Sequence, residues 1–252
     1  MTDFLPIARF AVLLIRPGAL VFMAPGLGGM YATSATKIGL TVLLALAVIP
    51  VAHMPDDFGD VALTIVIFRE VSIGLALAFA VRALIAGAEF AGHLTGHQIG
   101  FSYGATIDPQ SGVRNNMLAM LYGSLATLAF LAINGHHMLL RAMAASYQGL
   151  PIGVGHIDGS ILTGVQQMLA LVFTVAVRLA APIVVTLLIV ELAVGLISRT
   201  APSLSFMVIG YPIRIVIGLF VLAVFVPTIP AVTTSLLGGA IELSLRVAAA
   251  FK

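Results

Sequence analysis

The sequence predicts an all-α membrane protein built from broken helical hairpins that pack against other protein. Of its 252 residues, 60% are apolar and only 9% are charged, whereas a soluble domain carries about 25% charged residues. Because so few charged residues cannot cover the surface of a protein in water, that surface must instead be covered by lipid or by other apolar subunits. The lengths of the apolar runs and the charges inside them indicate that much of that cover is protein.

Six apolar runs define the elements in order. They are residues 10–24, 38–52, 61–86, 117–134, 165–197 and 204–230. The first two would reach only ~22 Å and the fifth ~50 Å as helices, against the ~30 Å core of a bilayer. Between them lie the connections 25–37, 53–60, 87–116 (glycine-rich), 135–164 (semi-polar) and 198–203. A tail, 231–252, follows the last run.

Prolines interrupt several of these runs. Pro182 lies in the middle of the longest, where its missing N–H and its ring are expected to bend or break a helix. The others are Pro17, Pro50, Pro212, Pro227 and Pro230. Freed backbone groups are tolerated at membrane depth only where protein or water satisfies them. The prolines therefore predict helices that pack on other helices.

Charged residues inside the runs make the same prediction. They are Arg69, Glu70, Arg178, Glu191 and Arg214. Facing lipid, each would cost roughly 2.5–3.5 kcal/mol, and all five on the order of 15 kcal/mol. These residues must therefore face protein or a water-filled cavity. There they could form an ion or proton relay, or they could form structural ion pairs between helices or subunits. A relay strings carboxylates along a path, whereas arginine predominates here, which favours pairing.

A four-residue repeat of small residues marks the glycine-rich stretch. Its members are Ala88, Gly92, Gly96, Gly100 and Gly104. On a helix they form one face that lets another backbone approach. Glu89, His93 and His97 form a neighbouring polar face that could bind zinc, but HExxH is missing and no fixed spacing adds another ligand. A face toward a hydrated lumen or a subunit is the favoured interpretation.

Other functional classes find little support. Residues 100–104 match G-x-S-x-G, but that motif is meaningful only at a strand–turn–helix junction with acid and histidine partners placed later. Here the glycines belong to the helical repeat and no strand precedes them. We expect no enzyme, and therefore no catalytic residue, metal or cofactor. A net charge of +2 without a basic run predicts no nucleic-acid partner. Turn formers such as Asp108-Pro109 make 101–116 a loop, either a simple surface turn or a functional element.

The ordered motifs resemble the FliR/SctT family of type III export-gate subunits over about residues 5–230. The C-terminal motif is Glu191-x3-Gly195-x3-Arg199-x2-Pro202, followed by Phe206, Gly210-x-Pro212-x-Arg214 and Gly218. The central block is Gly92, Gly96, Gly100-Phe101-Ser102, Asp108-Pro109, Asn134-Gly135-His136-His137, Ser146-Tyr147 and Pro151. Arg16-Pro17, Pro25 and Lys37 fit less specifically. Ser203-Leu204-Ser205 departs from the family's common Gln-x-Asn, which affects only the bonding of that turn.

The resemblance implies one FliR-type domain over 1–252. Approximately 1–164 would be FliP-like, 165–230 a FliQ-like hairpin hinged at Arg199 and Pro202, and 231–252 a tail. Family members form a helical hetero-oligomer with FliP and FliQ, with FlhA and FlhB nearby, in the bacterial inner membrane at the flagellar basal body. The resemblance also implies that the chain crosses the lipid bilayer several times. Unfolded flagellar proteins would be exported through the channel of the assembled gate. The implied channel plug comprises Phe101, Ser102, Tyr103, Asp108, Pro109, Gly112 and Arg114.

Two alternatives stay open. The virulence-secretion homologue SctT differs little in motifs, and the central block and the Asn134–His137 run favour the flagellar branch. A stand-alone polytopic transporter would show near-uniform spans of about 20 residues, which the run lengths oppose.

Overall fold

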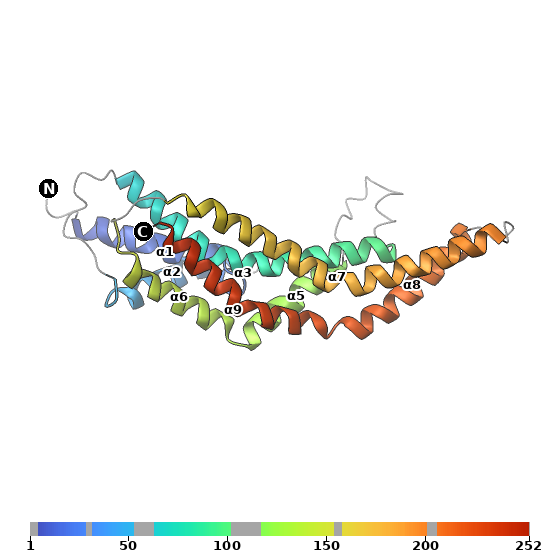
Figure 1. Ribbon diagram of the computed structural model, residues 1–252. Coiled ribbons are helices and arrows are strands. Elements are labelled where there is room, and N and C mark those ends of the chain that lie inside the picture. The colour runs from blue at the N-terminus through green and yellow to red at the C-terminus, as the bar shows by residue number, and fades with distance from the viewer. Residues whose placement is uncertain are drawn as a thin grey trace. The chain divides into compact units, whose positions relative to one another are not determined.

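The computed structural model describes residues 5–28, 32–52, 63–101, 117–153, 158–200 and 206–251. In that part of the chain all regular structure is α-helical, which confirms the predicted class. The helices are α1 (Leu5–Met23), α2 (Ser34–Val48), α3 (Leu63–Ile99), α5 (Met117–Ala132), α6 (Gly135–Gly149), α7 (Ser160–Thr200), α8 (Phe206–Phe225) and α9 (Thr228–Ala249) (Figure 1).

The helices differ widely in length, as the apolar runs predict. α3, α7 and α9 are long and apolar enough to cross a membrane, with 37, 41 and 22 residues. The number of such candidate spans in the described chain rises to four if α5 and α6, bent by 67°, count as one. α2 is apolar but has only 15 residues. The chain is therefore a membrane protein without uniform spans.

The prolines interrupt the helices less than expected. α7 runs through Pro182 as one helix, so of the expected bend or break, the break is not found there (Figure 1). The Thr186 hydroxyl donates a hydrogen bond to the Pro182 carbonyl, 2.7 Å away. Pro17 and Pro212 also lie inside helices. A proline removes one helical hydrogen bond, and a long helix has enough others to continue.

Two regions outside the expected runs are helical. α6 occupies the first half of the semi-polar stretch, and α9 takes in most of residues 231–252. α6 buries Leu139, Met143 and Tyr147, which recur every fourth residue and form one face. Apolar content alone does not reveal such a helix, because its other face is polar.

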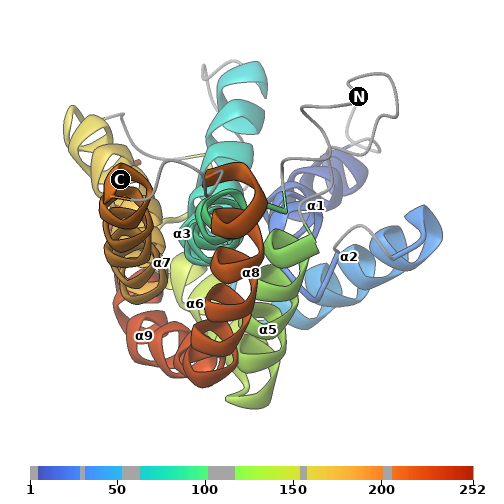
Figure 2. The same cartoon turned by 90° about the vertical axis from the view of Figure 1, so that its right-hand side faces the viewer.

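The chain divides into two compact units. The first comprises residues 1–84, 130–171 and 236–252. In it α1 packs on α2 (Figure 2), and a small core gathers Ala76 and Ala80 of α3, Met168 of α7, and Ala240 and Val247 of α9.

The second unit comprises residues 85–129 and 172–235. In it the C-terminal part of α3 contacts both α5 and α8. There Gly92 lies against the backbone of Ala119 in α5, and Ile99 lies against Gly218 of α8. Small residues at these contacts let neighbouring helices approach closely.

The bend between α5 and α6 depends on the backbone of Asn134. Its φ is +57°, the left-handed region, and no other described non-glycine residue has a positive φ. We expect Asn134→Gly to preserve the fold and Asn134→Val to destabilise it by about 1–2 kcal/mol, because a branched Cβ clashes in this conformation. The check is the aggregation temperature of the chain in mild detergent. Equal temperatures for both variants would contradict this role for the bend.

Candidate functional site

A buried ion pair in the first unit joins α1 to α3. Arg16 of α1 donates from Nε to Glu70 Oε2 at 2.8 Å and from Nη2 to Glu70 Oε1 at 3.1 Å. Both side chains are fully buried. This two-pronged geometry is the strongest arrangement available to an arginine and a carboxylate. The pair fixes the register of α1 against α3.

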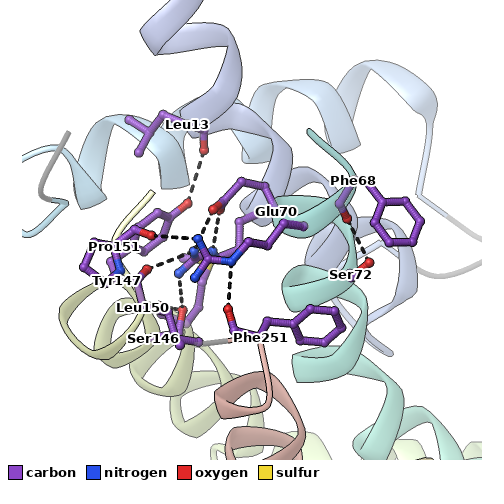
Figure 3. A network of polar contacts seen from close by, with 12 residues as sticks. Leu13, Phe68, Glu70, Ser72, Ser146, Tyr147, Leu150, Pro151 and Phe251 are labelled. Carbon is purple, nitrogen blue, oxygen red and sulfur yellow. Dashed lines mark hydrogen bonds and ion pairs between the residues drawn. The ribbon is translucent and has the colours of Figure 1, made fainter. Parts of the chain in front are cut away.

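The remaining donors of Arg16 reach α6 and its C-terminal end. Nη1 donates to the Ser146 hydroxyl at 2.9 Å and Nη2 donates to the Leu150 carbonyl at 3.2 Å. The guanidinium carbon lies 4.1 Å from the centre of the Tyr147 ring. The Tyr147 hydroxyl in turn donates to the Leu13 carbonyl at 3.2 Å, as Figure 3 shows. One guanidinium thus links three helices of the unit.

Arg69 extends this network to the C-terminal segment. Its Nε donates to the Phe251 carbonyl at 2.8 Å, and Nη1 donates to the Pro151 carbonyl at 3.4 Å (Figure 3). The side chain is buried, and its Nη2 has no hydrogen-bond partner in the described chain. Two consecutive residues of α3 therefore bind different neighbours. Glu70 binds helix α1, and Arg69 binds the segments around residues 151 and 251.

The α1–α3 approach also needs a small residue. A Cβ built on Gly74 would lie 2.5 Å from the Arg16 carbonyl oxygen and 2.8 Å from the Ala19 Cβ. Gly74 follows Glu70 by one helical turn, so both are on the same face of α3. That glycine permits the close contact and Glu70 supplies the charge, which indicates a tightly determined interface.

The second unit holds another charge cluster. Glu191 of α7 forms an ion pair with Arg214 of α8, with side chains 31% and 19% exposed. Gln98 of α3 donates from Nε2 to Glu191 Oε1 at 3.1 Å, and the Arg214 guanidinium lies 5.6 Å from the Tyr211 ring centre. α7 ends at Thr200 and α8 begins at Phe206, so the pair links the two helices on either side of 201–205.

The small-residue face is used in two different ways. Ala88, Gly92 and Gly96 are buried, and a Cβ on Gly92 would lie 2.6 Å from the Ala119 Cα. Gly100 instead follows the end of α3 with φ +109°, and the Phe101 N–H donates to the Gly96 carbonyl at 3.0 Å. That is the hydrogen bonding of a helix C-terminus, where glycine is preferred. Within α3 the repeat therefore comprises Ala88, Gly92 and Gly96, and Gly104 lies outside the described residues.

The other residues singled out from the sequence differ in how far they are exposed, and some lie outside the described residues. His93 and His97 are exposed and Glu89 is partly buried. No group of three or more His, Cys, Asp or Glu residues in the described segments could hold a metal. Arg178 and Arg199 are exposed, and Phe101 is 49% exposed. The other plug residues, Ser102 to Arg114, and Pro202 lie outside the described residues.

Sequence reasoning missed Arg16, Ser146, Tyr147 and Gln98 as members of polar clusters. For Arg16 a signal exists, because it lies within the first apolar run, where the insertion cost applies as it does to Arg69. Ser146 and Tyr147 are on the buried face of α6, which the four-residue spacing indicates.

The sequence of this chain is similar to those of several known proteins. A flagellar biosynthetic protein FliR of Escherichia coli (strain K12) is 32% identical over 218 residues, 86% of this chain and 83% of that protein. The Bacillus subtilis (strain 168) protein of the same name is 27% identical over 92% of each chain. The surface presentation of antigens protein SpaR of Shigella flexneri is 26% identical, covering 85% of this chain and 83% of SpaR. Residues 7–240 match one family as a whole, so the chain belongs to the bacterial export proteins, family 1.

Proposed function

We propose that the chain is a non-enzymatic subunit of a flagellar type III export gate in the bacterial inner membrane. The observation that carries the proposal is the family match, which runs over residues 7–240, together with relatives named flagellar biosynthetic proteins. The work of such a subunit is to shape a protein-conducting channel with FliP- and FliQ-like partners, with FlhA and FlhB as neighbours. Flagellar proteins are its substrates.

The physical features of the chain support this role. Polar clusters hold the helices of each unit in one register, as a channel wall requires. Large apolar side chains of α7, including Phe173, Leu192 and Leu196, are exposed by 61–66%. A surface of this kind needs lipid or neighbouring subunits to cover it. Residues 165–230 act as a FliQ-like hairpin, and 101–114 as the plug of the closed channel.

A virulence-type export gate is the second candidate, favoured by the similarity to SpaR. Removing the gene from the organism that encodes it distinguishes the two. We expect loss of motility and of secreted flagellar proteins, with their accumulation inside the cell, and recovery when the chain is supplied again. Loss confined to virulence effectors would favour the second candidate. Unchanged secretion of both classes of substrate would contradict the proposal.

A further inference from the structure

The exposed face of α7 is too long for lipid alone to cover. The helix has 41 residues, so it extends ~60 Å at ~1.5 Å per residue, about twice the ~30 Å hydrocarbon core. Exposed apolar side chains continue along its second part, among them Phe173, Val177, Val185, Leu192 and Leu196. About half of this helix therefore needs protein to cover it.

Arg178 lies on that face. Its side chain is exposed, and within the described residues it makes no hydrogen bond or ion pair. Glu191, the carboxylate of the same helix, is already paired with Arg214. Val177 and Val185, next to it and two turns away, are 60% and 54% exposed. An uncompensated positive charge thus lies within an apolar surface.

The backbone leaves a second polar group at the same place. In an α-helix the N–H of residue 182 would bond to the carbonyl of residue 178. Residue 182 is a proline and has no N–H to donate. A guanidinium donor and a carbonyl that lacks its helical partner therefore lie together at Arg178. Wherever water is excluded, the guanidinium requires an acceptor and the carbonyl requires a donor.

We propose that the face of α7 around Arg178 docks an apolar helix of a neighbouring export-gate subunit that carries an aspartate or glutamate at the level of Arg178. The valines make the apolar contact, and the carboxylate bonds the guanidinium with two hydrogen bonds. A second copy of this chain fits poorly, because the carboxylate of its own α7, Glu191, is already paired with Arg214. A lipid phosphate fits poorly because apolar side chains flank Arg178 in both directions along the helix. The partner class depends on the proposed function.

The test uses the full chain in its native membrane. A photo-reactive residue at Val177 should crosslink to another membrane protein, whose contact helix is then identified by mass spectrometry. Arg178→Glu should reduce the partner recovered with the tagged chain by at least about tenfold, the loss typical of breaking a desolvated charge pair. Arg178→Lys should retain most of it. Arg141→Glu is the matched control, since Arg141 is exposed on α6 and also has no partner among the described residues.

Reversing the charge in the partner completes the test. Changing the identified carboxylate to arginine should restore the amount of partner recovered with the Arg178→Glu chain. The same partner variant should be recovered poorly with the wild-type chain, because two arginines would then face each other. If Arg178→Glu does not accumulate, the crosslink from Val177 beside the native arginine still decides. Crosslinks to lipid alone or to a second copy would overturn the inference, as would a contact helix without a carboxylate. An unaffected Arg178→Glu complex would overturn it too, yet leave the proposed function intact, whereas a wild-type chain without export partners would contradict that function itself.

Discussion

Glu70→Gln is expected to cause the largest loss of stability among the single substitutions considered. It leaves the buried guanidinium of Arg16 without its counter-charge, and breaking one partner of a buried pair costs about 3–5 kcal/mol. That is a large part of the 5–15 kcal/mol that typically stabilises a folded domain. The measure is the amount of chain in the membrane fraction at fixed expression, with its resistance to limited proteolysis.

Two further variants make this result specific. Glu242→Gln removes an exposed partner of Arg246, with side chains 65% and 70% exposed, and surface pairs contribute only about 0–1 kcal/mol. Its accumulation should equal that of the wild type. Arg16→Met combined with Glu70→Leu should recover part of the loss, because an apolar replacement of both charges removes the unpaired group. Normal accumulation of Glu70→Gln alone would mean that the pair does not hold α1 on α3.

Gly92→Ala is expected to destabilise the second unit although it adds only one methyl group. The new Cβ would lie 2.6 Å from the Ala119 Cα and 2.6 Å from the Leu118 carbonyl oxygen. Both are backbone atoms, so α3 and α5 would have to move apart, and overpacking of this kind costs about 1–3 kcal/mol. The aggregation temperature in mild detergent should fall.

Gly195→Ala is the matched control for that change. Gly195 lies inside α7 in the same unit, and nothing would lie within 4 Å of its new Cβ. Alanine favours a helix over glycine by about 1 kcal/mol, so the purified chain should keep or slightly raise its aggregation temperature. If the two alanine variants behave alike, the close approach at Gly92 does not stabilise the unit.

The helical class and most helices could be predicted from hydropathy, because long apolar stretches in a chain this poor in charge have few other structures available. α6 could not be recognised by hydropathy, since half of its surface is polar. It becomes visible only through the spacing of its buried residues, such as Leu139 and Met143. The bend at Asn134 likewise depends on one residue in an uncommon backbone conformation.

The sequence predicts that polar clusters exist inside the helical units, but it does not predict which residues pair with each other. The cost of inserting a charge indicates that Glu70 and Glu191 need partners. Which partner each has depends on how the helices pack, and Arg16 is 54 residues away from Glu70 in the sequence. Gly92 was identified by its four-residue repeat, whereas Gly100 ends the helix because of a local hydrogen-bonding pattern that the repeat does not reveal.

The dependence of this chain on sister subunits is tested most directly by extracting the tagged protein from its native membrane in a mild detergent. FliP- and FliQ-like proteins should co-purify with it in one large complex that survives size-exclusion chromatography. A single, monodisperse species containing this chain alone, stable with its α7 surface covered only by detergent, would contradict a gate subunit and favour a transporter that works by itself.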